Sequence, residues 1–239
     1  MGFPPTNRLL EAFRAGSGAS ASSFLSEFEH VPMPVGSVLF HAGEEARYVH
    51  LMTAGIASMV TTMSGGDGVE VGLISREGFP EHLLLLGPQK SASECFMQVD
   101  GTAMRMSFKR FHEEFQRNEA LRALILEYTQ YEALALAQLA ACNRLHEVED
   151  RMARWLLMVQ DRMGEPVIRL TQEFLGDMLG TRRSSVTLVA GSLQRAGLIE
   201  YTRGSVTILD RAGLEQTTCE CYGIMQKRFN ALYAGGMAE

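Results

Sequence analysis

The sequence has no apolar segment long enough to cross a membrane. Its apolar runs, such as Leu83–Leu86, fall far short of the roughly 18 residues that a transmembrane helix needs. The first residues, Met1–Pro5, hold no basic region leading into an apolar stretch, so they do not read as a secretory signal. With 239 residues and 46% apolar residues, the chain is long enough for two modest domains. We expect a folded cytoplasmic protein that does not enter a membrane.

Cysteine is scarce, and the four cysteines are too scattered for a disulfide framework. We expect free thiols at Cys95, Cys142, Cys219 and Cys221. The pair around Glu220 could supply two metal ligands, but structural zinc sites usually separate paired cysteines by about two to four residues and use four ligands. The six histidines show no spacing such as His-x-x-x-His. The sequence therefore predicts no metal site.

The motifs of common enzyme classes are also missing. No nucleophile elbow, no phosphate-cradling glycine loop and no pair of catalytic carboxylates stand out. We predict neither enzymatic activity nor a cofactor.

Excess positive charge is lacking over the whole chain, whose formal net charge is −6. One region differs from this average: between Met178 and Arg211 there are five arginines against two acidic residues. A local basic surface of this kind is where the phosphate backbone of a nucleic acid would be bound.

The N-terminal part is rich in short β-type runs separated by glycine turns. After two short predicted helices, Arg8–Phe13 and Phe24–Glu29, which flank a flexible-looking Gly16–Ser23, the β-rich region runs from Pro34 to Phe108. The predicted strands are Ser37–His41, Tyr48–Thr53, Ile56–Thr62, Val69–Ile74, Cys95–Val99 and Thr102–Ser107, with turns that include Ala54-Gly55 and Asp100-Gly101. Closely spaced strands with such turns predict a compact antiparallel barrel or sandwich.

A long helix is predicted next, from Glu113 to Asn143, about 45 Å in length at roughly 1.5 Å per residue. Apolar and small side chains repeat along it at spacings of three and four, as in a coiled coil. The alternative is an amphipathic helix packed on its own domain; the length favours a dimer seam. The predicted interface residues are Leu121, Leu124, Tyr128, Tyr131, Ala135 and Gln138, with Cys142 continuing the repeat. We place the domain boundary near Asn143–His146, which gives domains 1–142, including the dimer helix at about 113–142, and 143–239.

The segment Leu170–Ile199 has the pattern of two short helices around a sharp corner. Thr171 is suited to cap the first helix, Gly180 to supply the positive φ of the corner, and Thr181 to cap the second. Arginine at the start of a recognition helix can bond guanine bidentately, and short hydroxyls bond phosphates or bases. A hairpin follows, with Arg203-Gly204 at its tip, as in a wing. The predicted DNA-binding residues are Thr171, Thr181, Arg182, Arg183, Ser184, Ser185, Thr187 and Arg203.

The segment from about Asn143 to Asp210 resembles the DNA-binding half of the Crp/Fnr superfamily. The resemblance implies an α+β chain with an N-terminal antiparallel β-roll like a cyclic-nucleotide-binding domain, a long dimerisation helix and a C-terminal winged helix-turn-helix. It further implies a homodimeric transcription regulator that binds double-stranded DNA at a palindromic operator, with RNA polymerase as a candidate partner. Arg183 matches a base-reading arginine. Ser184 and Leu188 stand where the family's cyclic-AMP receptor has a glutamate and a second arginine, so the operator should differ.

The effector of such a regulator is not evident from the β-roll. Family members that bind cyclic nucleotides use a glutamate for the ribose and an arginine-serine pair for the phosphate; here Leu83 and Lys90 fall at the glutamate and arginine positions. A lysine cannot make the same bidentate contact, so we expect DNA binding without cyclic AMP and leave the ligand-binding residues unassigned. The alternative function is a ligand-regulated protein–protein interaction module whose winged helix does not bind DNA.

Overall fold

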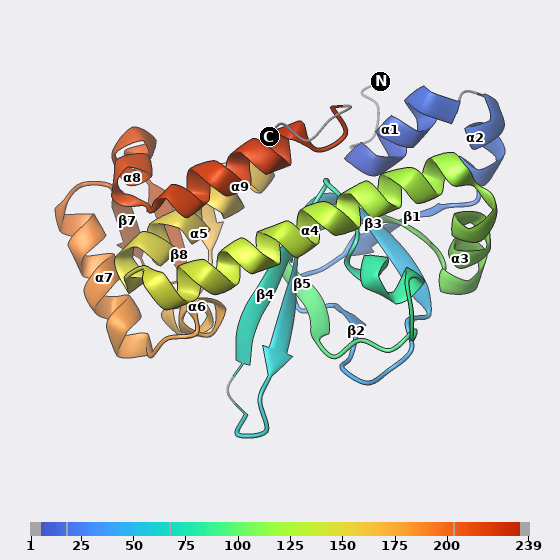
Figure 1. Ribbon diagram of the computed structural model, residues 1–239. Coiled ribbons are helices and arrows are strands. Elements are labelled where there is room, and N and C mark those ends of the chain that lie inside the picture. The colour runs from blue at the N-terminus through green and yellow to red at the C-terminus, as the bar shows by residue number, and fades with distance from the viewer. Residues whose placement is uncertain (1–5, 18, 67, 203, 235–239) are drawn as a thin grey trace. The chain divides into compact units, whose positions relative to one another are not determined.

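The computed structural model describes residues 6–17, 19–66, 68–202 and 204–234 (Figure 1). The chain forms two compact units. The first unit consists of Met1–Met59, Gly72–Leu134 and Arg228–Glu239, and the second of Val60–Val71 and Ala135–Lys227. The predicted domain boundary after residue 142 stays a prediction. Among the described residues, no helix combines the length and the apolar content that a membrane span requires.

The N-terminal sheet has five strands in the order β1-β5-β3-β4, with β2 also paired to β5. Both β1 and β2 run antiparallel to β5. The elements up to the long helix are α1 Arg8–Ser17, α2 Ala19–Leu25, β1 Glu29–Met33, β2 Val38–Phe40, β3 Tyr48–Thr62, β4 Gly68–Ile74, the 3-10 helix η1 Pro80–Leu85, β5 Glu94–Ser107 and α3 Phe108–Arg117. This arrangement confirms the predicted antiparallel β-domain of an α+β chain.

Two predicted turns are wrong, because β3 and β5 each continue through the glycine that was expected to end a strand. Gly55 has a φ of +80°, and a Cβ there would lie 2.7 Å from the carbonyl oxygen of Asp100. A Cβ on Gly101 would collide with the carbonyl group of Ala54. The two glycines therefore let neighbouring strands approach closely, a role that glycine in a strand often has.

The predicted helix at Phe24–Glu29 is also wrong, since the helix spans Ala19–Leu25 in the stretch that reads as flexible and Glu29 already pairs with Arg105 in the sheet. Burial explains the difference: the Phe24 ring packs edge-on against Phe13 and Phe28, at centroid distances of 6.1 and 5.4 Å. Such tertiary packing overrides weak local propensity.

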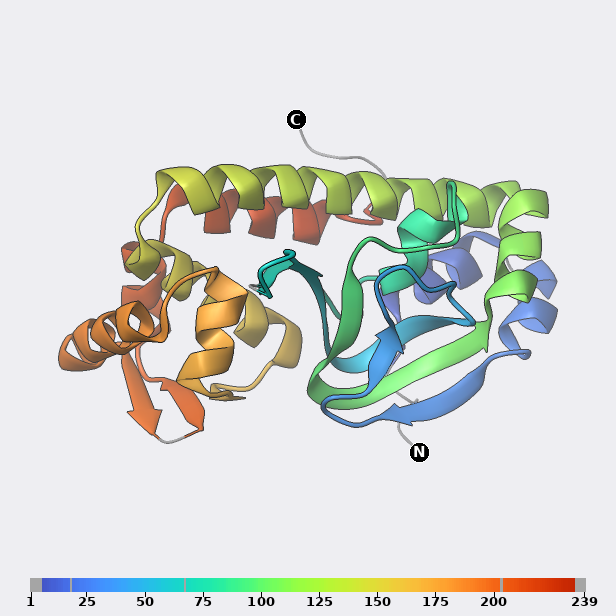
Figure 2. The same cartoon turned by 90° about the horizontal axis from the view of Figure 1, so that it is seen from below.

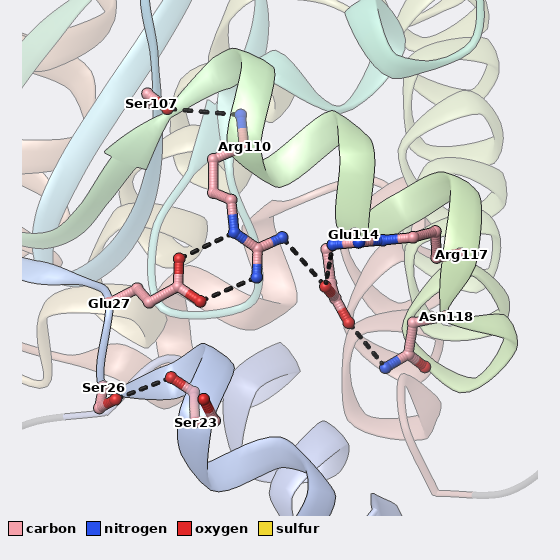
Figure 3. A network of polar contacts seen from close by, with 8 residues as sticks. All are labelled: Ser23, Ser26, Glu27, Ser107, Arg110, Glu114, Arg117 and Asn118. Carbon is pink, nitrogen blue, oxygen red and sulfur yellow. Dashed lines mark hydrogen bonds and ion pairs between the residues drawn. The ribbon is translucent and has the colours of Figure 1, made fainter.

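Arg110 on α3 forms hydrogen bonds and an ion pair with Glu27, which lies just before β1 (Figure 3). Its Nε and Nη2 donate to the two carboxylate oxygens of Glu27, both at 2.8 Å, and its Nη1 donates to Glu114 at 3.0 Å. The side-chain oxygen of Ser107 caps the helix by accepting from the backbone N–H of Arg110 at 3.3 Å. A bidentate contact of this kind fixes orientation as well as distance, so α3 is held firmly before the long helix starts.

The long helix α4 spans Glu119–Leu145 and not 113–143. Asn118 ends α3 with φ −100° and ψ 104°, and its Oδ1 accepts from the backbone N–H of Leu121 at 3.1 Å. This capping contact favours a break over continuation of the helix. The 27 residues of α4 give a helix about 40 Å long at roughly 1.5 Å per residue.

The predicted dimer seam on α4 is largely directed into the chain's own core. Leu121 and Tyr128 have no exposed surface, Tyr131 has 3%, and all three belong to the apolar core of the first unit. Leu124 packs against the same core and Ala135 is partly buried. Side chains with at most 3% of their surface exposed cannot form a seam with a second chain, so the seam prediction is wrong for Leu121, Tyr128 and Tyr131. These three side chains fit the alternative prediction, in which the helix packs against its own domain.

The second unit holds several helices and a small antiparallel sheet in the order β6-β8-β7. Its strands β7 and β8 are seen as an orange pair of arrows in Figure 2. Its elements are α5 Val148–Met163, β6 Val167–Arg169, α6 Gln172–Leu179, α7 Arg183–Arg195, β7 Ile199–Thr202, β8 Ser205–Ile208, α8 Arg211–Thr217 and α9 Glu220–Ala231, which ends in the first unit. Trp155 on α5 is buried and donates its Nε1–H to Glu70 at 2.9 Å. Gly164 ends α5 as its C-cap with a φ of +73°, a left-handed conformation that glycine adopts readily.

Candidate nucleic-acid interface

At the corner between α6 and α7, the predicted roles of Thr171 and Gly180 are confirmed. Thr171 caps α6, its Oγ1 accepting from the backbone N–H of Phe174 at 3.1 Å. Gly180 ends α6 with a φ of +58°, and the backbone N–H of Thr181 donates to the carbonyl oxygen of Gly176 at 2.9 Å. Sequence reasoning missed Gly176: a Cβ there would lie 3.0 Å from the carbonyl oxygen of Thr181, so a glycine lets the corner fold tightly on α6.

Thr181 does not cap α7 as expected. The capping residue is Arg182, which has extended backbone angles and no side-chain capping bond, and the helix begins at Arg183. The first backbone N–H groups of a helix have no intrahelical acceptor and carry the positive end of the helix dipole. The start of α7 can therefore bind an anionic group through backbone N–H groups as well as arginine side chains.

The two faces of α7 differ in exposure as a recognition helix requires. Val186, Ala190 and Leu193 are buried against the unit's core. The exposed side chains at the N-terminal end are Arg182, Arg183, Ser184, Thr187 and Leu188, and Thr181 and Ser185 are partly exposed. The Thr187 hydroxyl donates to the carbonyl oxygen of Arg183 at 3.0 Å. This end of α7 thus offers cations, hydroxyls and one large apolar side chain to a partner.

Leu188 is 73% exposed, the second most exposed large apolar side chain among the described residues, after Leu145 at 74%. A solvated surface gains nothing from such a side chain, whereas the methyl group of thymine is an apolar feature of the major groove. Behind α7, the side chain of Gln194 accepts from the backbone N–H of Tyr201 at 2.9 Å and so ties the helix to β7. Burial raises the pKa of Tyr201, and the charge of nearby Arg183 acts in the opposite direction.

The wing is the antiparallel pair β7 and β8, in which Thr202 pairs with Ser205. Their hydroxyl oxygens lie 2.7 Å apart. Arg203, the predicted contact at the tip, lies outside the described residues. Sequence reasoning missed Arg169, which is exposed on β6 and pairs with Ser205 beside the tip. Its signal was weak, because one arginine between two apolar residues of a short strand is common on any half-buried sheet.

In the β-domain, the segment that holds Leu83 and Lys90 contains one carboxylate, Glu81. The ribose-binding glutamate was expected at position 83, and Glu81 was not considered. Glu81 has no exposed surface; it accepts from the backbone N–H of His50 at 3.1 Å and lies 2.8 Å from the Nδ1 of His50. Leu83, the residue expected at the glutamate position, is 51% exposed. Lys90 is exposed and forms an isolated β-bridge with Glu45.

Comparison with known proteins matches two family models to consecutive parts of the chain. The cyclic nucleotide-binding domain model matches residues 30–118, and the Crp-like helix-turn-helix domain model matches residues 150–217. The chain belongs to the Crp/Fnr family of transcription regulators. The matched helix-turn-helix range of this Crp/Fnr regulator contains α6, α7, β7 and β8, so these elements belong to its DNA-binding domain.

Relatives of this Crp/Fnr regulator agree along most of its length. The cyclic AMP receptor protein of Thermus thermophilus is 25% identical over 198 residues, which cover 80% of this chain and 89% of that protein. The global nitrogen regulator of Synechococcus elongatus is 20% identical over 221 residues, 88% and 96% of the two chains. The solved structure of the c-di-GMP responsive global regulator CLP of Xanthomonas campestris matches with a TM-score of 0.66 and 18% identity, covering 81% of this chain and 98% of that one. The likeness in fold confirms the predicted architecture.

Proposed function

We propose that this Crp/Fnr regulator binds a palindromic DNA operator sequence-specifically as a homodimer, with α7 in the major groove. The observation that carries the proposal is the N-terminal end of α7, where Arg182 and Arg183 are both exposed over a helix-turn-helix corner. The positive charges of two arginines interact unfavourably with the positive end of the helix dipole. Such placement stabilises the protein little by itself and is favourable when an anionic partner arrives.

The proposed DNA contacts fall into two groups, those to base edges and those to phosphates. We assign Arg183, in the first turn of α7, to a guanine edge, and Leu188, about one turn further along, to a thymine methyl group. The residues assigned to phosphates, or to nearby base edges, are Thr171, Thr181, Arg182, Ser184, Ser185 and Thr187. Arg203, which the sequence places between β7 and β8, is assigned to phosphate. Arg169, which pairs with Ser205 on β8, is assigned to the phosphate backbone as well.

The dimer interface is assigned to the exposed face of α4 in place of the buried seam. Small or apolar side chains, interrupted by one glutamine, recur on this face at spacings of three and four, which is the repeat of a two-stranded coiled coil. They are Ala123, Leu126, Gln130, Ala133, Ala137 and Ala140. Leu126 is 46% exposed, an apolar side chain of the kind that a second copy of the helix would cover. Alanine-rich faces permit two helices to approach closely.

DNA binding should not require cyclic AMP. The carboxylate that could hold a ribose, Glu81, already accepts hydrogen bonds from His50 and is fully buried. Freeing it for a ligand would break these contacts and leave buried polar groups unpaired, at a cost of about 1–3 kcal/mol each. The nucleotide phosphate would meet a lysine, Lys90, without the bidentate geometry of arginine.

The test is selection of binding sites from random DNA duplexes by the purified protein, alone and with cyclic AMP or c-di-GMP. We expect a two-fold symmetric site whose half-sites lie about one helical turn apart, enriched without any nucleotide. No enrichment in any of the three arms, with a folded protein, would favour the alternative of a protein–protein module. Enrichment of DNA sites only when a nucleotide is present would overturn the proposal that DNA binding does not require one. RNA polymerase is the partner that a DNA-bound regulator would then contact.

A further inference from the structure

Four potential metal ligands meet in the second unit. Cys142 and His146 lie one turn apart at the end of α4, where the backbone N–H of His146 donates to the carbonyl oxygen of Cys142 at 3.1 Å. Cys219 immediately precedes α9, and Cys221 lies in its first turn. The three sulfur atoms and one imidazole nitrogen all lie within 4.8 Å of one another, and the cysteines are buried. The fold thus joins two short segments that are 75 residues apart at His146 and Cys221.

We propose that Cys142, His146, Cys219 and Cys221 bind one Zn²⁺ ion in a tetrahedral Cys₃His site. This goes beyond DNA recognition and does not depend on it. A zinc–sulfur bond of about 2.3 Å gives a tetrahedron with sulfur–sulfur edges of about 3.8 Å. The Sγ atoms of Cys142 and Cys219 are 3.6 Å apart, and Cys221 Sγ lies 3.6 Å from His146 Nδ1. Four protein ligands leave no open position, so the ion would be structural and not catalytic.

The surroundings of the four ligands are those of a metal site. His146 Nδ1 faces the sulfurs, while its Nε2 lies 3.3 Å from a carboxylate oxygen of Glu220. Metal-bound imidazoles commonly donate their other N–H to a carboxylate, which fixes the ring and its tautomer. The side-chain amide of Gln138 donates to Cys221 Sγ at 3.1 Å. Gln138, predicted as a dimer contact, therefore points toward this cluster.

Buried positive charge beside the cluster provides an independent argument. Arg151 and Arg154 are 8% and 2% exposed, and neither forms an ion pair with a carboxylate within the described part of the chain. Among the residues that the structure describes, their Nε atoms have no hydrogen-bond partner, and Arg154 donates from Nη1 to the sulfur of Met158 at 3.3 Å. Three thiolates around Zn²⁺ carry a net charge of −1. That charge would balance guanidinium groups that otherwise lie buried without a counter-ion.

A thiol pair alone would be a weaker explanation of the same geometry. Oxidation of Cys142 and Cys219 would form a disulfide, but the sulfurs are 3.6 Å apart against a bond length of about 2.05 Å. A disulfide would also leave His146, Cys221 and the two arginines without a role. Zinc uses all six groups at once.

The direct test uses the full-length chain, reduced, stripped of metal by a chelator and titrated with Zn²⁺. We expect about one Zn²⁺ bound per chain with release of thiol protons. Titration with Co²⁺ should give the visible bands of a tetrahedral ion and a thiolate charge-transfer band. A folded, reduced wild-type chain that binds no Zn²⁺ and gives no such Co²⁺ spectrum overturns the proposal, as does recovery of a Cys142–Cys219 disulfide in protein purified without oxidant.

Variants separate this site from adventitious binding. Cys221→Ser and His146→Gln should weaken Zn²⁺ binding by more than about 100-fold, and Glu220→Gln by about 10-fold or more, since it removes only the carboxylate behind His146. Cys95→Ser is the matched control, because that buried cysteine lies in the first unit and should leave binding unchanged. If the ligand variants do not fold, Glu220→Gln still decides: an unaltered affinity contradicts the assigned geometry. None of these measurements involves DNA, so their failure is distinct from failure of the proposed function.

Discussion

His82, in the core of the first unit, should make the stability of the protein depend on pH. Burial lowers the pKa of His82 to about 4 from the ordinary 6.5, although its hydrogen bond with the carbonyl oxygen of Phe79 acts in the opposite direction. The ring packs against Tyr128, with 5.0 Å between centroids. In the unfolded chain the same imidazole takes up a proton near its ordinary pKa. As pH falls from 7 toward 4, the unfolded state binds a proton that the folded state excludes, so stability falls.

The size of the effect follows from the pKa difference. At about 1.4 kcal/mol per unit, a shift of roughly two to three units removes about 3 kcal/mol of unfolding free energy by pH 4. Equilibrium urea unfolding, followed by circular dichroism between pH 7 and 4, measures this slope. His82→Gln should flatten it by about that amount, while His30→Gln, at an exposed histidine, should not. Identical slopes for the wild type and His82→Gln would show that His82 does not cause the pH dependence.

Three further predictions concern the helices and the effector. Ala133→Glu combined with Ala137→Glu should produce folded monomers by light scattering, whereas Ala212→Glu, an exposed helical alanine outside α4, should not; an unchanged mass would contradict the assigned interface. Gly180→Ala should cost about 1–2 kcal/mol in thermal unfolding, because a side chain at φ +58° is strained. Cyclic AMP should change operator affinity by less than about threefold, under ~1 kcal/mol, in a fluorescence anisotropy titration; a larger gain would contradict the role assigned to Glu81.

Local signals determined the parts of the fold that sequence reasoning predicted correctly. The corner residues Thr171 and Gly180 act through their own backbone conformation and nearest neighbours, so spacing alone identifies them. The order of β-domain, long helix and winged helix also follows from changes in periodicity along the chain. The turns predicted at Gly55 in β3 and Gly101 in β5 were wrong. A glycine that ends a strand and a glycine that lets two strands approach closely look the same in the sequence.

Long-range contacts account for what could not be predicted. On α4, one repeat of three and four faces the core through Leu121 and Tyr128, and a second, alanine-rich repeat is exposed. Periodicity shows that a face is apolar but not whether its own chain covers it. Cys142 fitted the first repeat and was counted with it. Only the folded chain brings Cys142 and His146 beside Cys219 and Cys221.

The most direct test of the central claim, that α7 reads DNA, is the affinity of Arg183→Ala for the selected operator and for a random duplex. We expect a loss of about 1–3 kcal/mol, about 5- to 150-fold, on the operator, with preference flattened at one base pair per half-site. Arg195→Ala, at the far end of the same helix, is the control and should lose little. Arg203→Ala should weaken both duplexes alike and lower the salt slope by about one per subunit. Uniform weakening by Arg183→Ala, with base preference altered by Arg203→Ala, would contradict the account.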